Sequence, residues 1–116
     1  MTEENKPIDP QRALRDIAKT APLYAQAKAD RIYCDEYRKS LKAILMKQAI
    51  KEGFEAANAQ EREAYAHPEY VKHLEALREA VQVEESLRWR MVAAEAAVEV
   101  WRSQEASNRM MDRGTR

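Results

Sequence analysis

Glycine and proline are scarce in this sequence, and their scarcity limits the fold classes open to it. Among 116 residues there are two glycines, Gly53 and Gly114, and four prolines. Compact all-β and α/β folds need many tight turns, which these two residue types normally supply. The sequence is instead rich in Ala, Glu, Arg, Lys and Leu, which favour helices. The composition therefore predicts an all-α protein with few chain reversals.

Three further features that the sequence lacks bear on the compartment of the protein and on its partners. Cys34 is the only cysteine, which excludes an intramolecular disulfide and fits a reducing compartment. No apolar run approaches the roughly 20 residues of a membrane-spanning helix, and the polar first residues are not those of a secretory signal. Basic and acidic residues balance at 20 each, so net charge favours no nucleic-acid partner. We therefore expect a cytoplasmic protein without a membrane partner.

Helix start and stop signals divide the chain into four helices inside one domain. Asp9 is a good N-cap before Pro10, and Pro22 disfavours the α conformation in the residue before it. The pair His67-Pro68 gives a second break. The predicted helices are about 10–20, 22–57, 59–65 and 68–111, in a domain of residues 9–112 between tails at 1–8 and 113–116.

Two positions define the predicted reversal between the long helices. Gly53 costs about 1 kcal/mol relative to alanine inside a helix, so fraying is expected to begin there. Asn58, followed three residues later by Glu61, resembles a capping box for the short helix at 59–65.

The two long helices are expected to form an antiparallel, coiled-coil-like hairpin, with the short N-terminal helix beside it. A helix as long as 68–111 needs a partner along its length, and a short link makes neighbouring helices antiparallel. With the reversal near residue 65, Leu41 would face Trp89. The basic stretch 37–51 would then lie opposite the acidic stretch 75–85, which favours the same direction.

The last helix carries more apolar residues than one neighbouring helix can cover. Trp89 and Trp101 lie about 120° apart around the helix axis, so they cannot share one narrow stripe. We therefore expect self-association into a dimer or a larger helical bundle. The predicted interface residues are all large and apolar: Val83, Leu87, Trp89, Val98 and Trp101.

The sequence contains no pattern typical of catalysis, a metal site or a cofactor. The spacing of His67, His73 and Cys34 is not that of a zinc site, and CxxC and HExxH are absent. A lone cysteine among apolar neighbours is typical of a core residue. Glycine-rich phosphate loops are absent as well. These features indicate a non-enzymatic protein with no cofactor and no metal.

A basic stretch with tyrosines nearby is the candidate contact surface for nucleic acid or a partner protein. Cations beside Tyr33 and Tyr37 can neutralise and stack single-stranded DNA. The alternative is that these cations pair with acidic residues of the facing helix. The candidate contact residues are Arg38, Lys39, Lys42, Lys47, Lys51, Arg88 and Arg90.

Three segments carry a resemblance to a known family. They are EREAYAHPEY at 61–70, followed by Leu74 and Leu77, then ESLRWRMVAAEA from Glu85 and EVWRSQEASNR from Glu99. Together they resemble a family of small helical proteins of tailed bacteriophages and prophages, often encoded near single-strand annealing recombinases and exonucleases. The similarity covers roughly residues 20–110. It implies a phage origin, a place in the host-cell cytoplasm and a role in DNA recombination or replication, and it brings no catalytic motif.

Three non-enzymatic functions are compatible with these observations. The first is a phage accessory protein that binds single-stranded DNA or a phage or host DNA-metabolism protein as a helical oligomer. The second is a protein-directed inhibitor of a host nuclease or defence system, of the anti-CRISPR or anti-nuclease type. The third is a structural coiled-coil module whose main property is oligomerisation.

Overall fold

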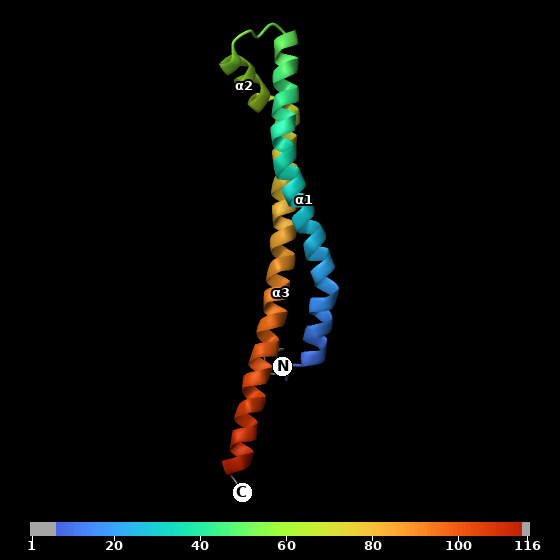
Figure 1. Cartoon of the computed structure of the whole chain (residues 1–116), viewed down its shortest axis with the longest axis vertical. Helices are drawn as coiled ribbons and strands as arrows, with labels where there is room; N and C mark the ends of the chain where they lie inside the picture. The colour runs from blue at the N-terminus through green and yellow to red at the C-terminus, as the bar shows by residue number, and fades with distance from the viewer. Residues whose placement is uncertain (1–6, 115–116) are drawn as a thin grey trace, which may run out of the picture. The chain divides into compact units, whose positions relative to one another are not determined.

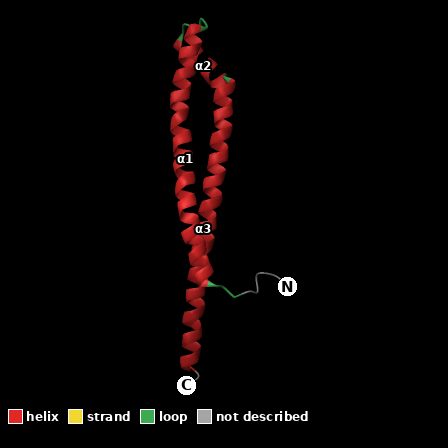
Figure 2. Ribbon diagram, turned by 90° about the vertical axis from the view of Figure 1, so that its right-hand side faces the viewer, coloured by secondary structure: helices red, strands yellow, loops and turns green. Residues whose placement is uncertain are grey.

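The computed structural model describes residues 7–114, and every regular element in that range is an α-helix (Figure 1, Figure 2). The helices are α1, Pro10–Lys51; α2, Ala57–Ala66; and α3, Pro68–Gly114. Helices α1 and α3 have 42 and 47 residues, whereas α2 has 10. The prediction of an all-α chain with two long helices and a reversal between them is confirmed. Residues 1–6 and 115–116 of the predicted tails lie outside the described range.

The start of α1 confirms the predicted cap. The Asp9 carboxylate accepts hydrogen bonds from the backbone N–H groups of Gln11, at 3.0 Å, and Arg12, at 3.3 Å. These are donors that a helix leaves without partners in its first turn. Pro10 follows as the first helical residue.

The predicted break at Pro22 is wrong, because α1 runs through this proline without interruption. A proline inside a helix removes one hydrogen bond and crowds the preceding turn, at a cost of about 3 kcal/mol. Helix α1 continues nevertheless, with Thr20 fully buried and Tyr24 half-buried on either side of the proline. The predicted separate helix at 10–20 is therefore the first part of α1.

Helix α1 ends at Lys51, six residues before the predicted end at 57. Gly53 has a φ of +102°, a conformation that glycine adopts without steric cost. The N–H of Gly53 donates to the carbonyl of Ile50, and the N–H of Phe54 donates to the carbonyl of Ala49, each at 3.1 Å. This is a Schellman motif, which ends a helix instead of fraying it.

The predicted capping box at Asn58 is also wrong. Helix α2 begins at Ala57, and its N-cap, Ala56, makes no side-chain capping bond. The loop is held instead by Gln60, whose side-chain amide donates to the carbonyl of Phe54 at 2.9 Å. Glu61 does not reach back to the cap and pairs with a lysine of α1.

The predicted break at His67-Pro68 is confirmed, because α2 ends at Ala66 and α3 begins at Pro68. His67 Nδ1 accepts a hydrogen bond of 3.0 Å from the backbone N–H of Glu69, so the histidine caps α3. Helix α3 continues to Gly114, so residues 113–114 are helical and the tail predicted there is wrong.

The chain divides into two units. Unit 1 contains Met1–Tyr24 and Ser86–Arg116, and unit 2 contains Ala25–Glu85. In unit 1, Asp16 of α1 contacts Arg90 of α3. In unit 2, Arg31 of α1 contacts Glu84 of α3. Cys34, which lies later in α1, contacts His73, which lies earlier in α3. Within each unit α1 and α3 are therefore paired, and the order of contacts in unit 2 is antiparallel.

The register of the hairpin differs from the predicted one. Leu41 clusters with Tyr70, not with Trp89. Helix α2 lies beside the end of α1 (Figure 1), where Glu61 contacts Lys42. Because α2 occupies this position, the first turn of α3 packs beside Leu41 and not beside the last residues of α1. The acidic stretch 75–85 consequently does not face the basic stretch 37–51.

Buried and half-buried positions on both long helices recur in alternating steps of three and four residues, the spacing of a coiled coil. We call these positions the seam. In unit 2 the seam contains Ala27, Arg31, Cys34, Arg38, Leu41 and Leu45 of α1 and Tyr70, His73, Leu77, Ala80 and Glu84 of α3. In unit 1 it contains Ala13, Ile17, Thr20 and Tyr24 of α1 and Leu87, Met91, Ala94, Val98 and Trp101 of α3. Within residues 7–114, no helix combines the length and apolarity needed to cross a membrane.

Candidate interaction surfaces

The buried apolar core is small, and much of it is alanine. Its members are Ala27, Leu41, Leu45, Ala49, Ala64, Tyr70 and Ala94. The largest cluster lies in unit 2, where Leu41, Leu45, Ala64 and Tyr70 pack together with Met46 against them. Because hydrophobic stabilisation scales with buried apolar area, this core contributes little for a chain of this length.

A charged pair occupies the seam near one end of unit 2. The Arg31 guanidinium donates to both carboxylate oxygens of Glu84, at 2.6 and 2.9 Å. The Glu84 side chain is 11% exposed and that of Arg31 is 31% exposed. A charge left alone in such a place is strongly unfavourable, so this pair disfavours other registers of the two helices.

Cys34 and His73 form a second polar contact across the seam. His73 Nε2 lies 2.6 Å from the carbonyl oxygen of Cys34 and 3.6 Å from its Sγ. A carbonyl oxygen can only accept, so Nε2 is the donor and is not free to take a proton from the thiol. Tyr37 packs against the imidazole with ring centroids 5.4 Å apart. Within residues 7–114, no group of three or more metal-ligating side chains comes together.

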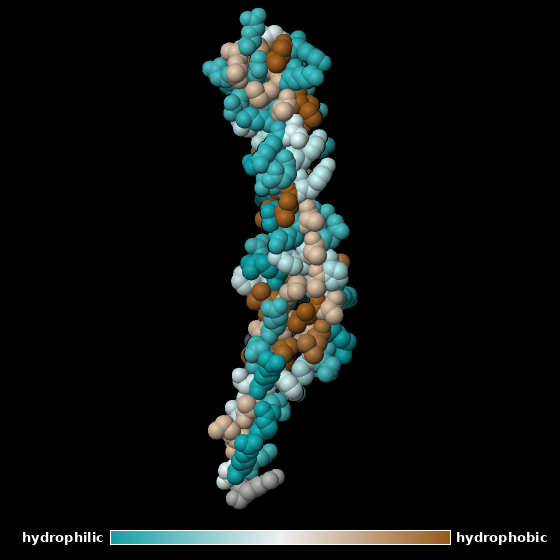
Figure 3. Space-filling view, in the orientation of Figure 1, coloured by the Kyte–Doolittle hydropathy of each residue, from teal (hydrophilic) through white to brown (hydrophobic). Residues whose placement is uncertain are grey.

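Large apolar side chains are abundant outside the core. Within residues 7–114, seventeen of them are exposed, and both units contribute. Figure 3 shows apolar patches interrupting the hydrophilic surface on the face turned to the viewer. Patches of this kind on soluble proteins mark interaction sites.

The five predicted interface residues divide into two groups. Trp89 is 59% exposed and Val83 is 53% exposed, so both are accessible to a partner. The half-buried Leu87, Val98 and Trp101 occupy seam positions of α3. Arg88 is half-buried and lies over the Trp89 ring, 4.5 Å from its centroid.

Three of the predicted basic contacts come together in unit 2. They surround a hollow of about 310 Å³ whose lining residues are Arg38, Lys39, Lys42, Tyr65 and Tyr70; we call this set the cation–tyrosine cluster. Lys42 Nζ lies 4.7 Å from the Tyr65 ring centroid, and the Tyr65 and Tyr70 rings meet edge to face at 5.2 Å. The predicted tyrosines, Tyr33 and Tyr37, stack on each other instead. The place of Tyr65 in the cluster could not be predicted from the sequence, because it depends on how α2 packs against α1.

Carboxylates neighbour each cation of the cluster. The pairs are Arg38 with Asp35 at 3.1 Å, Lys39 with Glu36 at 3.0 Å and Lys42 with Glu61 at 3.1 Å. Hydrogen bonding to Tyr65, and then to Glu61, raises the pKa of Lys42. Arg38 Nε is buried and has no hydrogen-bond partner among the described residues. Each cation of the cluster is therefore paired with a nearby carboxylate, while the Nε–H group of Arg38 has no acceptor among the described residues.

The other predicted basic contacts lie elsewhere. Lys47 and Lys51 are exposed on the last turns of α1. Arg90 belongs to unit 1, where it donates to Asp16 at 2.7 Å. The seven predicted residues are thus divided between the two units.

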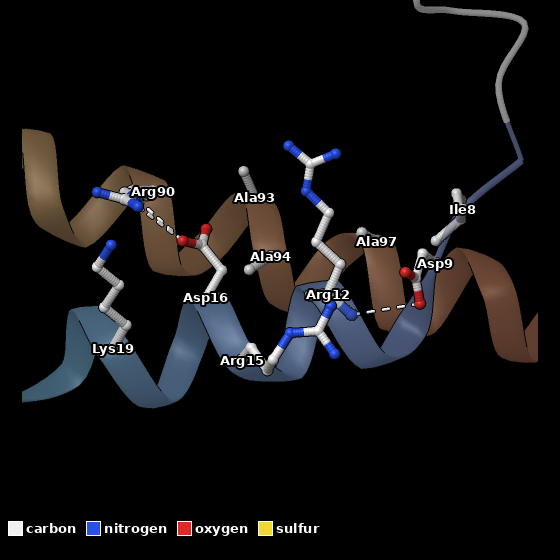
Figure 4. Close-up of a pocket in the computed structure, with 11 residues that line it drawn as sticks. Ile8, Asp9, Arg12, Arg15, Asp16, Lys19, Arg90, Ala93, Ala94 and Ala97 are labelled. Carbon is white, nitrogen blue, oxygen red and sulfur yellow. Dashed lines mark hydrogen bonds and ion pairs between the residues drawn. The ribbon is translucent and has the colours of Figure 1, made fainter.

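A groove between α1 and α3 in unit 1 was not predicted from the sequence (Figure 4). Its volume is about 960 Å³. Along α3 the wall is formed by Ala93, Ala94 and Ala97; Figure 4 shows Ala94 between the two helices and Ala93 at the edge of α3 that lies away from α1. Alanine is too small to fill the space between the helices, so a hollow remains beside the buried Ala94.

Basic side chains outnumber acidic ones around this groove. Arg12, Arg15, Lys19 and Arg90 line it together with Asp9 and Asp16, so four positive and two negative charges give a net charge of +2. The hydrogen bond from Arg90 lowers the pKa of Asp16. The Asp16–Arg90 pair therefore stabilises the fold at neutral pH, and that contribution is lost as the pH falls through the lowered pKa.

Arg12 and Lys19 act on Asp16 only through their charge, which contributes to the lowering of its pKa. Among residues 7–114, the side chains of Arg12, Arg15 and Lys19 make no hydrogen bond and no ion pair. Figure 4 shows Arg12 and Lys19 extending beyond the backbone of α1 on the α3 side, whereas Arg15 lies along the outer side of α1. The seven-residue spacing of Arg12 and Lys19 was a usable sequence signal for one helical face.

The fold and these surfaces define an α-helical hairpin with a polar seam and exposed apolar patches. Comparison with known proteins found no matching family model, no matching curated protein and no matching solved structure.

Proposed function

We propose that this protein is a non-enzymatic assembly module that acts as a helical oligomer. The observation that carries the proposal is the contrast between a small, alanine-rich core and seventeen exposed large apolar side chains. Burying part of that surface against other copies supplies hydrophobic stabilisation that two helices alone lack. Closed symmetric oligomers are the usual solution for soluble chains of this kind.

Self-association is expected to appear as a molar mass above the 13.4 kDa of one chain. Light scattering after size exclusion measures that mass, and the thermal midpoint should rise with protein concentration because association stabilises the folded state. Trp89→Ser is expected to lower the mass or weaken its concentration dependence. Lys47→Ser, at an exposed charged position of α1, is the matched control and should leave both unchanged. A wild-type chain that stays at 13.4 kDa throughout the micromolar range would contradict the proposal.

A second candidate function is binding of single-stranded DNA, as an accessory protein of phage recombination or replication. The cation–tyrosine cluster supports it, since it combines three cations, two tyrosines and the unpartnered Nε of Arg38. Cations that track the backbone and aromatic rings that stack on bases are what single-strand binding requires. The family resemblance supplies the biological setting of this proposal.

Binding of a labelled oligonucleotide is expected to weaken steeply with salt, because phosphate contacts release counterions. The variant Arg38→Gln/Lys42→Gln should bind more weakly and reduce the salt slope by about 0.7 for each lost phosphate contact. Arg78→Gln, at an exposed position of α3, serves as the control. Fluorescence anisotropy across a salt series measures both quantities. No binding at low salt would exclude this function.

A further inference from the structure

We propose that the groove of unit 1 binds an acidic amphipathic helix of a partner protein. This site is separate from the cation–tyrosine cluster, and it does not depend on self-association. Three features of the groove carry the proposal: its open volume, its alanine wall and its positive charge.

The alanine wall favours a helix over other ligands. The walls supplied by Ala13, Ala93, Ala94 and Ala97 offer methyl groups and few polar partners. An extended peptide would leave its backbone N–H and C=O groups without partners against such walls, whereas a helix satisfies its own. Small wall residues also allow a third helix to approach α1 and α3 closely. The volume of about 960 Å³ accommodates several leucine-sized side chains rather than one.

The charges define the flanks of that helix. Asp16 is already bound by Arg90, and the Asp9 carboxylate caps α1. Arg12 and Lys19 remain available, seven residues apart on one helix, which corresponds to about 10 Å along its axis. Glutamates at the same spacing on an antiparallel or parallel partner helix can reach both cations. The groove therefore selects an apolar helix face bordered by acidic residues.

The test uses two synthetic helices of about 20 residues, long enough to be helical when bound. Both carry the same leucine stripe; one has glutamates on its flanks seven residues apart, and its twin has lysines at those positions. We expect the full-length protein to bind the acidic helix at least about tenfold more tightly than the lysine twin. Fluorescence anisotropy of the labelled peptides measures the difference.

Two variants assign the binding to this groove. Arg12→Glu/Lys19→Glu should weaken binding of the acidic helix about tenfold or more and strengthen binding of the lysine twin. Ala93→Trp fills the groove from an exposed position of α3 and should block both peptides without altering the charge. Lys47→Glu/Lys51→Glu makes the same charge change on α1 in unit 2 and should leave the affinity unchanged. Circular dichroism shows whether each variant remains helical.

Several results would overturn the proposal. Equal affinity for the two peptides would show that the charges of the groove do not select the partner helix. Unchanged binding by the two groove variants would show that the peptide binds outside the groove. If those variants lower the molar mass of the protein but not its peptide affinity, the occupant is a second copy of this chain. If a single-stranded oligonucleotide displaces the acidic helix from the wild-type protein and Arg12→Glu/Lys19→Glu no longer binds that oligonucleotide, the occupant is nucleic acid.

Discussion

Replacement of Leu45 by alanine is expected to lower the free energy of unfolding by about 2–4 kcal/mol. Leu45 is 2% exposed and belongs to the cluster formed with Leu41, Ala64 and Tyr70. Removing its isobutyl group leaves a cavity at the point where α1, α2 and α3 meet. The loss is large relative to total stability because the core contains few other large side chains. Urea unfolding followed by far-UV circular dichroism measures the change.

The neighbouring Ile44→Ala variant is the matched control. Ile44 lies on the same helix but is 53% exposed, so its truncation should change the free energy of unfolding by about 0.5 kcal/mol or less. Both variants are compared at one protein concentration, because association also contributes to stability. Equal losses for Leu45 and Ile44 would contradict the core described for unit 2.

The second large effect is expected at the ion pair in the seam. Glu84→Gln keeps the shape of the side chain but replaces the carboxylate that the Arg31 guanidinium binds by a neutral amide. Breaking a fully buried pair costs roughly 3–5 kcal/mol, and partial exposure of Arg31 lowers the expected loss to about 1–3 kcal/mol. Thermal and urea unfolding at neutral pH measure this loss.

Two further variants separate the pair from the general effect of losing a charge. Glu36→Gln removes a carboxylate from an exposed pair with Lys39 and should change stability by about 0.5 kcal/mol or less. Arg31→Met/Glu84→Met replaces both charges by apolar side chains and should recover part of the loss, since neither charge is then left alone. A Glu84→Gln variant as stable as Glu36→Gln would show that the seam pair does not fix the register.

Much of the secondary structure was predictable because local signals determine it. The Asp9 cap and the His67-Pro68 break act through neighbouring backbone groups, so they can be recognised in sequence. Gly53 followed by Phe54 was also a recognisable signal, because a glycine and then an apolar residue is typical of a Schellman motif. The cost of Gly53 inside a helix is thus the smaller part of its effect, since its positive φ ends α1.

Other features depend on packing and could not be predicted from local signals. Pro22 is a local signal for a helix break, but α1 continues through it, and the burial of Thr20 beside it depends on tertiary packing. The register was misplaced because α2 was treated as a connector, whereas it packs beside α1 through Lys42 and Glu61. An error in the position of α2 shifts every contact between α1 and α3. It therefore also displaced the predicted partners of the basic stretch 37–51.

The position of α2 beside α1 also bears on the order in which the chain folds. The contacts around α2 join residues 6 and 19 positions apart in the sequence, through Gln60 and Lys42. The Arg31–Glu84 and Asp16–Arg90 contacts join residues 53 and 74 positions apart. Loop-closure entropy increases with this separation, so the segment around α2 closes at the lowest entropic cost. Pairing of the two long helices can then extend from that closed end, each new contact shortening the loop that the next one must close.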